Sequence, residues 1–296
     1  MRTCVIFNPA ARGNKARHFS RWLNGVASEC TLKPTTGPGD ARRLGAEAVA
    51  DDFELIVAAG GDGTVNEVLN GLGDVPNGFE RARLGVLPLG TVNVFARELK
   101  LPLRIPDAWK ILQRGHERKI DLPLVEFSDG GKPGRRYFAQ LAGAGLDARA
   151  IELVSWRHKQ QVGPLAYVIA GLKAIAGQNP EITVRANGHE SSGQLILVGN
   201  GRLYGGSFAV FPAAGLSNGW LEVCCLPRAD FPTLLRLAPR VLFRGLLPEK
   251  MVHRMRVKQF ELTSEVPAAF ELDGEWVGHL PATFLIGSKQ LRVIVP

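Results

Sequence analysis

The sequence predicts an α/β N-terminal domain with a doubly wound sheet, followed by an antiparallel, β-rich C-terminal domain. Before Asp121, buried strand-like runs are followed by glycine turns and helix-like runs, which is the pattern of a parallel sheet covered by helices. After Asp121, short strand-like runs are separated by Gly, Pro and Asn turns, with few helices between them, as in antiparallel sheets. We therefore place the domains at 1–124 and 125–296, and leave open a return of the last strand to the first domain.

The first domain alternates strands and helices. In chain order we expect strands at 5–7, 53–59 and 84–87, and helices at 41–50, 65–72 and 92–99. The second strand is apolar except for Glu54, as is usual for a strand buried on both faces of a parallel sheet. In the helix after it, apolar residues recur from Val65 at positions i, i+3, i+4 and i+7, which is the spacing of one buried helix face.

The second domain is rich in short strand-like runs. They lie at 137–142, 182–184, 194–198, 221–226, 259–262 and 283–286. Two helical segments, 147–173 and 231–247, stand between them. We interpret 129–134 as an exposed hairpin tip and Asp273-Gly274 as the turn of a strand pair. These runs predict an antiparallel sheet with two helical insertions.

The composition is that of an ordinary globular protein. Of the 296 residues, 45% are hydrophobic and 22% are charged, which excludes a wholly disordered chain and a coiled rod. The net charge of +8 favours anionic partners such as nucleotides, acidic lipid surfaces or nucleic acid. We expect no nucleic-acid binding, because the aromatic residues do not alternate with basic residues as a stacking surface requires.

Neither the cysteines nor the apolar runs indicate an exported or membrane-spanning protein. The four cysteines form no C-x-x-C pair, and the six histidines show no metal-ligand spacing. The N-terminus turns polar too soon for a signal peptide, and no apolar run reaches the roughly 20 residues that cross a bilayer. We therefore expect a cytoplasmic protein, and leave open peripheral contact with the inner membrane face and a homodimer.

The strongest chemical signal is the turn after the second expected strand. Gly60, Gly61 and Gly63 allow the backbone to turn tightly and approach a ligand, and the following helix start offers N–H groups. Such a turn suits phosphate oxygens. Asp62 adds a carboxylate that can hold Mg²⁺ directly or through water. The alternative is a glycine-rich connection with Thr64 as helix cap and no ligand.

A second turn has the same elements. Gly90-Thr91-Val92-Asn93 also follows a buried strand and opens a helix. Because the carboxyl ends of neighbouring parallel strands face one crevice, we expect the two turns to line it together. Two polar glycine turns at one sheet edge predict a nucleotide cleft.

Nearly end to end, the chain resembles the diacylglycerol kinase catalytic-domain family, which includes sphingosine, ceramide and bacterial lipid kinases. The matching segments are GGDGTVNEVLNGL at 60–72, PLGTVNVFAR at 88–97, Asn8-Pro9 with Gly13, Thr35 to Ala41, Ala142 to Asp147, Tyr204 to Gly206, Phe211 to Ala213, and Asp273-Gly274-Glu275. NAD kinases and phosphofructokinases share GGDGT but lack these continuations. The resemblance therefore implies a first domain of phosphofructokinase or NAD kinase type, with lipid-kinase chemistry.

The resemblance implies phosphorylation of a lipid hydroxyl by ATP with Mg²⁺, in a nucleotide cleft between two domains. Phosphoryl transfer needs in-line placement, charge neutralisation and an acceptor for the hydroxyl proton. By similarity, Asp62 organises Mg²⁺ and the γ-phosphate. The residues expected to bind nucleotide are Asn8, Lys15, Thr35, Gly60, Gly61, Gly63, Thr64, Asn66, Glu67, Gly90, Thr91 and Asn93. For Lys15, an ordinary solvated lysine is the alternative.

Glu275 is the expected general base, because the family places its proposed base in this DGE segment. The alternative is that Glu275 only belongs to the strand pair, while Asp273 forms its turn. Asn218 stands where many members have an acidic residue, which argues against a second, structural Mg²⁺ there. Val94 replaces the acidic residue of the G-T-x-N-D form, so the lipid is not identified.

Arg236, Arg240 and Arg244 form a basic stripe on an expected helix rich in leucine and valine. Such a helix can lie on an anionic membrane surface. Alternatively, it packs on the core of the protein with a solvated charged face.

The sequence thus predicts a kinase that transfers the γ-phosphoryl group of ATP to diacylglycerol or a sphingoid-like lipid, as in phospholipid biosynthesis. One alternative is a kinase of a soluble polyol or dinucleotide. Another is a catalytically silent regulatory protein that binds nucleotide or lipid.

Overall fold

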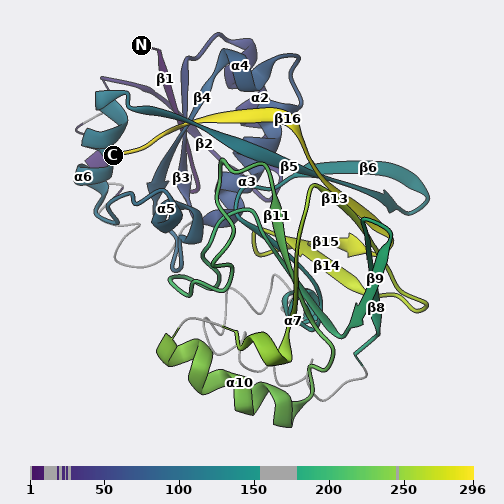
Figure 1. The fold of residues 1–296 in the computed structure, drawn as a ribbon. Helices are drawn as coiled ribbons and strands as arrows, with labels where there is room; N and C mark the ends of the chain where they lie inside the picture. Colours follow the sequence, from purple (N-terminus) through teal and green to yellow (C-terminus); the bar gives the residue numbers. More distant parts are fainter. Residues whose placement is uncertain are drawn as a thin grey trace. The chain divides into compact units, whose positions relative to one another are not determined.

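The computed structural model describes residues 2–9, 19, 22, 23, 25, 28–153, 179–244 and 247–296. The chain divides into two compact units, whose elements are labelled in Figure 1. One unit comprises Met1–Leu122 with Ser288–Pro296, and the other comprises Pro123–Gly287. Two long strands, β5 (Glu117–Asp129) and β16 (Ala282–Ile294), pass from one unit into the other.

A parallel sheet forms the centre of the first unit. Its strands are β1 (Thr3–Phe7), β2 (Thr31–Pro34), β3 (Leu55–Gly60) and β4 (Arg83–Pro88). They run parallel in the order β2-β1-β3-β4, and Val293 of β16 pairs in parallel with Leu84 of β4. Every residue of β3 is buried, as expected for a strand that is covered on both faces.

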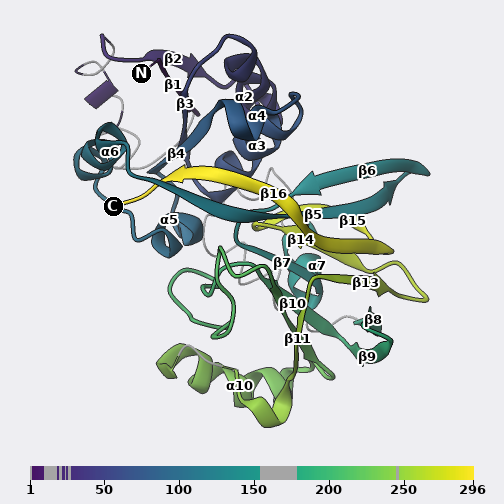
Figure 2. The same cartoon turned by 45° about the horizontal axis from the view of Figure 1, so that its top comes forward.

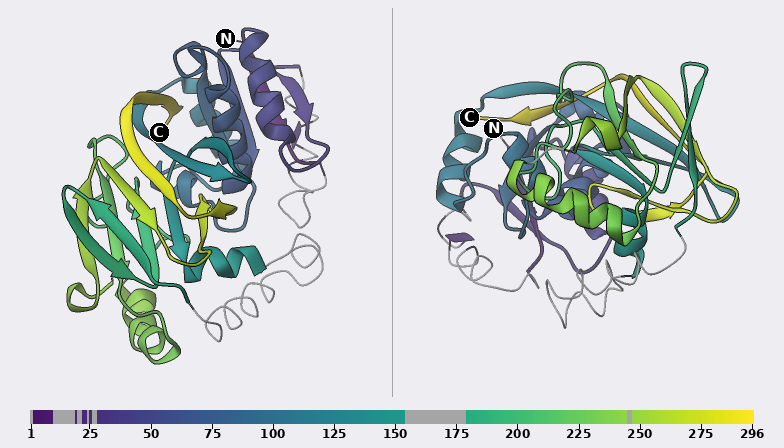
Figure 3. Two further views of the ribbon diagram at one scale, coloured as in Figure 1. Left: turned by 90° about the vertical axis from the view of Figure 1, so that its right-hand side faces the viewer. Right: turned by 60° about the horizontal axis from the view of Figure 1, so that its bottom comes forward.

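Helices connect these strands. They are α2 (Asp40–Ala50), α3 (Asp62–Gly73), α4 (Gly78–Arg81), α5 (Val94–Glu98) and α6 (Ile105–Arg114). α2 and α3 lie side by side (Figure 3, left), because Gly71 of α3 faces the backbone of α2. A Cβ atom at Gly71 would collide with the carbonyl oxygen of Arg42. Each strand and helix expected in this domain is present.

The second unit is built from antiparallel strands (Figure 2). They are β6 (Lys132–Tyr137), β7 (Leu141–Gly145), β8 (Ile182–Ala186), β9 (His189–Gly193), β10 (Leu195–Gly199), β11 (Leu221–Leu226), β12 (His253–Val257), β13 (Gln259–Thr263), β14 (Ala269–Leu272) and β15 (Glu275–His279). One sheet has the order β12-β11-β10-β7-β14-β15. In the other, β16, β13, β8 and β9 pair in turn, and β5 pairs with β6. The predicted fold class is therefore confirmed for both domains.

Aromatic side chains fill the core of the second unit. Phe260 and Phe284 stack with ring centroids 4.8 Å apart, and Phe138 and Phe270 meet Phe284 edge to face. All four are almost completely buried, so their apolar area contributes strongly to the stability of this unit.

Three helices complete the described part of the second unit. They are α7 (Leu146–Leu153), α10 (Phe231–Arg244) and the short 3₁₀ helix η1 (Glu249–Met251). The helix expected at 147–173 is thus present up to 153, and its remainder lies outside the described residues. No helix among the described residues is long and apolar enough to cross a membrane.

The strand expected at 137–142 is wrong in one respect. β6 ends at Tyr137 and β7 begins at Leu141. Between them, the N–H groups of Ala139 and Gln140 are bound by the carboxylate of Asp273. Because these donors serve a side chain instead of a neighbouring strand, the run divides into two strands.

Candidate active site

The loops after β1, β2, β3 and β4 lie at one edge of the parallel sheet. Phe7 at the end of β1 is level with Pro34 of β2 and Ala59 of β3. Gly60 of β3 is level with Pro88 of β4. Since the strands are parallel, the residues that follow them are neighbours at the carboxyl edge of the sheet. The fold thus gathers the loops that contain the predicted nucleotide-binding residues.

The strand order places a reversal point between β1 and β3. β2 follows β1 in the chain but lies on the side of β1 away from β3. In open α/β sheets, ligands bind outside the carboxyl ends of the strands at such a point. Asn8 follows β1 and Gly61 follows β3, so they flank it. Thr35 follows β2, and its N–H donates to the carbonyl oxygen of Phe7 at 2.8 Å.

The two glycine turns are in direct contact. The carbonyl oxygen of Gly60 accepts hydrogen bonds from the N–H groups of Leu89 at 2.9 Å and Gly90 at 3.2 Å. A Cβ atom at Gly90 would stand 2.6 Å from the Cα atom of Gly61, well inside the normal separation of non-bonded carbon atoms. The structure therefore brings the turns together, as their positions after neighbouring strands predict.

Asp62 joins the two turns a second time. Its Oδ2 accepts a hydrogen bond from the N–H of Val94, and its Oδ1 accepts one from Phe95, both at 3.1 Å. These N–H groups begin α5, where the positive end of a helix favours a carboxylate. Each carboxylate oxygen can accept more than one bond. Asp62 can thus hold α5 and also accept Mg²⁺ or a water of its hydration shell.

Glu67 has a similar role for α2. Its Oε1 accepts a hydrogen bond from the N–H of Gly39 at 2.9 Å, and its Oε2 accepts one from Ala41 at 3.0 Å. Gly39 precedes α2 with φ at 82°, in the left-handed region that glycine tolerates. The role that the structure shows for Glu67 is to hold α2 against α3, and its position near ATP stays a prediction.

The beginning of α3 presents backbone donors. The helix begins at Asp62, and Gly61 before it is extended, with no cap from a described side chain. The helix cap that the ligand-free alternative assigned to Thr64 is therefore wrong, because Thr64 lies in the first turn and packs over Gly60. N–H groups in a first turn have no acceptor within the helix and carry partial positive charge. Those of Gly63 and Thr64 suit phosphate oxygens.

In the second loop, Asn93 is buried and Thr91 is exposed. Asn93 has φ at 53°, and its Nδ2 donates to the carbonyl oxygen of Gly90 at 2.7 Å. This bond closes the loop just before α5. Thr91 is left at the surface of the loop, where its hydroxyl is accessible.

The remaining predicted nucleotide-binding residues differ in their surroundings. Asn8 is exposed after β1. Asn66 is fully buried, and its backbone and side-chain oxygens accept hydrogen bonds from Nδ2 of Asn70 at 2.8 and 3.2 Å. The hydrogen bonds of Asn66 thus lie in the interior of the first unit. Lys15 lies outside the described residues.

The late DGE segment forms the turn between β14 and β15. Asp273 and Gly274 have φ at 50° and 83°, as in the tight hairpin turns that favour Asp-Gly. The Asp273 carboxylate accepts hydrogen bonds from the N–H groups of Ala139, Gln140 and Leu141 at 2.8, 2.9 and 3.1 Å. Asp273 is thus a turn former, as expected, and it also anchors the chain before β7.

Glu275 is the first residue of β15 and is half-buried. The N–H of the preceding residue, Gly274, donates to Oε2 of Glu271 at 2.6 Å. Asp273 and Glu271 thus fix the turn and, with it, the start of β15. Glu275 and Asp62 belong to different units, so a cavity shared by their carboxylates stays a prediction.

A pair of buried carboxyl groups, Glu271 and Asp147, lies near this turn. Asp147 ends the matching segment Ala142 to Asp147, but the sequence does not predict that it meets Glu271. A Cβ atom at Gly143 would be 2.9 Å from both Oε1 of Glu271 and Oδ2 of Asp147, so both oxygens lie beside this glycine. Glu271 is 0% exposed, and its Oε1 has no hydrogen-bond partner among the described residues. Burial, and then the charge of Asp147, raise the pKa of Glu271 well above its ordinary value.

Asp147 and Tyr204 complete this cluster. Burial of its carboxyl group raises the pKa of Asp147, although a hydrogen bond from Tyr204 acts in the opposite direction. Burial, and then the charge of Asp147, raise the pKa of Tyr204 well above its ordinary value. Two carboxyl groups in such surroundings do not both ionise easily, so they retain protons above the pH at which exposed carboxyl groups lose them.

Asn218 makes two hydrogen bonds, one of which an acidic residue could not make. Its Oδ1 accepts from the N–H of Trp220 at 3.0 Å, and its Nδ2 donates to the carbonyl oxygen of Ala213 at 3.3 Å. A carboxylate has no N–H for the second bond. Nearby, Nη1 of Arg254 donates to Oε1 of Glu222 at 2.6 Å. A cationic side chain therefore already pairs with the buried carboxylate of this region, which does not favour a second Mg²⁺.

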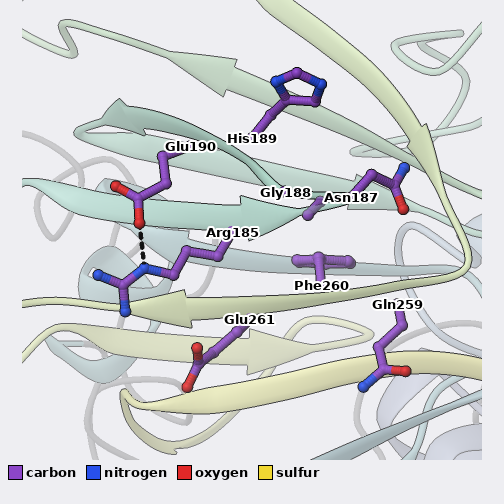
Figure 4. A pocket seen from close by; sticks show the side chains of 9 residues that line it. Arg185, Asn187, Gly188, His189, Glu190, Gln259, Phe260 and Glu261 are labelled. Atoms are coloured by element: carbon purple, nitrogen blue, oxygen red, sulfur yellow. Dashed lines mark hydrogen bonds and ion pairs between the residues drawn. The ribbon is translucent and has the colours of Figure 1, made fainter.

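A hollow of about 460 Å³ lies elsewhere in the second unit (Figure 4). Residues 185–190 of the β8–β9 hairpin and 259–261 of β13 line it. At its rim, Nε of Arg185 donates to Oε1 of Glu190 at 2.6 Å. None of the predicted site residues lines this hollow.

The raised pKa of Glu271 predicts a pH-dependent effect of the substitution Glu271→Gln. Because its folded-state pKa is raised, Glu271 keeps its proton in the folded protein after an unfolded chain has lost it. The folded state then binds more protons, so this group's contribution to stability falls as pH rises from the ordinary glutamate value of 4.5 towards the raised pKa. Glutamine cannot ionise but can still accept the bond from Gly274.

We expect Glu271→Gln and the wild-type protein to melt at similar temperatures at low pH. Towards neutral pH the variant should become the more stable of the two. Thermal unfolding across a pH series measures this difference, with the exposed Glu265→Gln as the matched control. A difference that does not change with pH, or an equal change in the control, would contradict the account.

Two family models match the chain. Residues 2–125 match the diacylglycerol kinase catalytic domain, and residues 140–295 match the YegS C-terminal NAD kinase beta sandwich-like domain. A diacylglycerol kinase of Staphylococcus carnosus strain TM300 is 30% identical over 305 residues, which cover 100% of this chain and 95% of the relative. A diacylglycerol kinase of Bacillus subtilis strain 168 is 30% identical over 303 residues, which cover 100% and 96%.

A solved structure shows the same fold. The crystal structure of a diacylglycerol kinase from Bacillus anthracis strain Sterne superposes with a TM-score of 0.75 at 23% identity, over 100% of this chain and 97% of that chain. The similarity to the curated relatives extends over the whole chain and therefore through both units. This chain therefore belongs to the diacylglycerol kinase catalytic-domain family.

Proposed function

We propose that this protein is an ATP-dependent lipid kinase that phosphorylates a hydroxyl group of diacylglycerol or of a sphingoid-like lipid. The observation that supports it most is the contact between Gly61 and Gly90, which joins the exits of β3 and β4 at the carboxyl edge of the parallel sheet. This contact gathers the backbone donors of two strand-exit loops at one place. The relatives named diacylglycerol kinase put diacylglycerol first among the acceptors.

In this proposal the backbone at the start of α3 holds phosphate oxygens. The N–H groups of Gly61, Gly63 and Thr64 supply hydrogen bonds without a mobile side chain, and the helix end adds partial positive charge. Thr91 reaches the same edge from the second loop. These groups neutralise charge on the phosphates where phosphoryl transfer requires it.

Asp62 is the proposed Mg²⁺ ligand. Its two oxygens already accept the N–H groups of Val94 and Phe95, and this fixes the carboxylate relative to the α3 turn. Mg²⁺ in nucleotide sites is commonly bound by one or two protein carboxylates together with phosphates and water. A single carboxylate from Asp62 is compatible with such a coordination. When bound, the ion would supply positive charge on the transferred phosphoryl group.

Glu275 is the proposed general base. The hydroxyl oxygen of the lipid attacks the γ-phosphorus, the bond to the β-phosphate oxygen breaks to leave ADP, and Glu275 takes the hydroxyl proton. The hydrogen bonds of Asp273 and Glu271 support this role, because they fix the turn that precedes Glu275. A base that follows a fixed turn is already positioned before the substrate binds, so less conformational freedom is lost on binding.

A catalytically silent regulatory protein is the alternative that Asn218 suggested. The hydrogen bonds of the Asn218 amide to Ala213 and Trp220 close a loop. They give a structural explanation for asparagine at this position. This hydrogen bonding is independent of phosphoryl transfer. It therefore weakens the motive for a silent protein and leaves the kinase as the function that the site supports best.

The direct test uses γ-labelled ATP, Mg²⁺ and a panel of acceptors in detergent micelles. The panel comprises diacylglycerol, a sphingoid base, ceramide, glycerol and NAD. We expect labelled lipid from diacylglycerol or the sphingoid base, and none after Mg²⁺ is chelated or in Glu275→Gln. Label on NAD without lipid would select the dinucleotide kinase, and bound ATP with no labelled product would select the silent protein.

Asp62→Asn should reduce both turnover and stability. Asparagine retains one acceptor oxygen for the two N–H groups at the start of α5, so we expect a loss of about 1–3 kcal/mol in the free energy of unfolding. Turnover should fall at least about a hundredfold, because charge stabilisation in the transition state is lost.

Asp52→Asn is the matched control for this substitution. Asp52 pairs with Arg81 in the same unit, its side chain is 77% exposed, and its φ of 60° also suits asparagine. We expect it to remain near wild type in both measurements. Near-normal turnover in Asp62→Asn would remove Asp62 from catalysis, and an unchanged unfolding free energy would remove it as the cap of α5.

A further inference from the structure

α10 has an exposed apolar surface. Phe231 and Leu235 are 56% and 61% exposed, although large apolar side chains on a soluble protein normally turn inward. Pro232 and Pro239 are exposed on the same helix. Leu237, in contrast, is only 3% exposed, so the helix is anchored to the protein by its other side.

These residues divide α10 into three faces. At about 100° per residue, Phe231, Pro232, Leu235 and Pro239 fall within an arc of about 100°. Leu237 lies about 240° from Phe231, on the side that packs against the protein. The exposed apolar arc is therefore a distinct surface and not the edge of the buried face.

Exposed arginines border the apolar arc. Arg236 and Arg240 lie about 140° and 180° from Phe231, between the apolar arc and the buried face, and both are exposed. The segment 231–244 contains no Asp or Glu. Asp230, immediately before the helix, accepts a hydrogen bond from the N–H of Thr233 at 2.9 Å. This carboxylate is occupied in fixing the first helical turn.

The position of Pro239 suggests how deeply the helix would insert. Pro239 has no N–H to donate to the carbonyl oxygen of Leu235, four residues earlier. That carbonyl needs water or another donor, which the interior of a bilayer does not provide. A position among the lipid head groups satisfies both the carbonyl and the apolar arc.

We propose that α10 docks the protein on an anionic phospholipid bilayer, with Phe231 and Leu235 among the upper acyl chains and Arg236 and Arg240 at the phosphates. An apolar arc bordered on one side by cationic side chains, in a helix without acidic residues, is complementary to such a surface. The net charge of +8 acts in the same direction. The proposal rests on the lipid-kinase function for its biological purpose, because a water-insoluble acceptor must be reached in its membrane.

The test is sedimentation of the full chain with phosphatidylcholine vesicles, with and without phosphatidylglycerol. We expect wild-type protein to bind the anionic vesicles, and to bind them more weakly as salt is added. The double variant Phe231→Ser/Leu235→Ser should lower the partition coefficient at least about tenfold, because two apolar side chains lose their burial. Arg236→Gln/Arg240→Gln should weaken the preference for phosphatidylglycerol.

Matched controls keep this experiment specific. Val266→Ser replaces another side chain that is 56% exposed, and Arg256→Gln replaces an exposed arginine on β12. Both should bind as wild type does. Equal loss in these controls, or unchanged binding of the α10 variants, would overturn the proposal. So would a wild-type dimer that Phe231→Ser/Leu235→Ser converts to monomer without affecting vesicle binding.

Activity measurements separate this proposal from the proposed function. With the lipid in detergent micelles, Phe231→Ser/Leu235→Ser should match wild-type turnover, whereas with the lipid in anionic vesicles it should lose activity. Equal activity on vesicles would overturn docking by α10 and leave the kinase intact. Vesicle binding that depends on Phe231, without phosphorylation in either format, would support docking and refute the lipid kinase.

Discussion

The contact between Gly61 and Gly90 is the constraint on which the candidate site depends. A single added carbon at Gly90 would stand 2.6 Å from the Cα atom of Gly61, so the two strand-exit loops can meet only as bare backbone. This closeness allows the carbonyl oxygen of Gly60 to bind Leu89 and Gly90. It also brings Asp62 within reach of the first N–H groups of α5. The N-termini of α3 and α5 therefore lie together at the carboxyl edge of the parallel sheet.

Carboxylates fix the geometry in both units by accepting backbone N–H groups. Asp62 holds α5, Glu67 holds α2, and Asp273 holds the chain before β7. Glu271 accepts the N–H of Gly274 and remains buried beside Asp147. Acidic residues of the motifs thus stabilise the fold through hydrogen bonds. A catalytic role for Asp62 would come in addition to this structural role.

Much of the fold could be predicted because its signals are local. The apolar run of β3, the helical spacing that begins at Val65 and the glycine turns each lie within a dozen residues. The parallel order of the strands then follows from general rules for α/β sheets, and it places the two turns together. For the same reason the Asp-Gly turn before Glu275 could be recognised from two residues.

The remaining features depend on partners far away in the sequence. Asp62 binds an N–H group 32 residues later, and Asp273 binds Ala139 across 134 residues. A motif shows that a carboxylate is present, but it does not show which donor the carboxylate meets. The break after Tyr137 and the burial of Glu271 could not be predicted for this reason. The alternative interpretation made Thr64 the cap of α3 because threonine is favoured at caps, whereas the backbone makes Gly61 the residue before the helix.

Hydrogen exchange of the backbone amides at residues 61–64, with and without ATP and Mg²⁺, tests whether the two glycine turns together bind the nucleotide. We expect nucleotide to slow exchange of these amides and of those at 90–95, while exchange in the β8–β9 hairpin is unchanged. Nucleotide that binds, as shown independently by equilibrium dialysis, but leaves the amides of 61–64 and 90–95 unaffected would contradict this expectation.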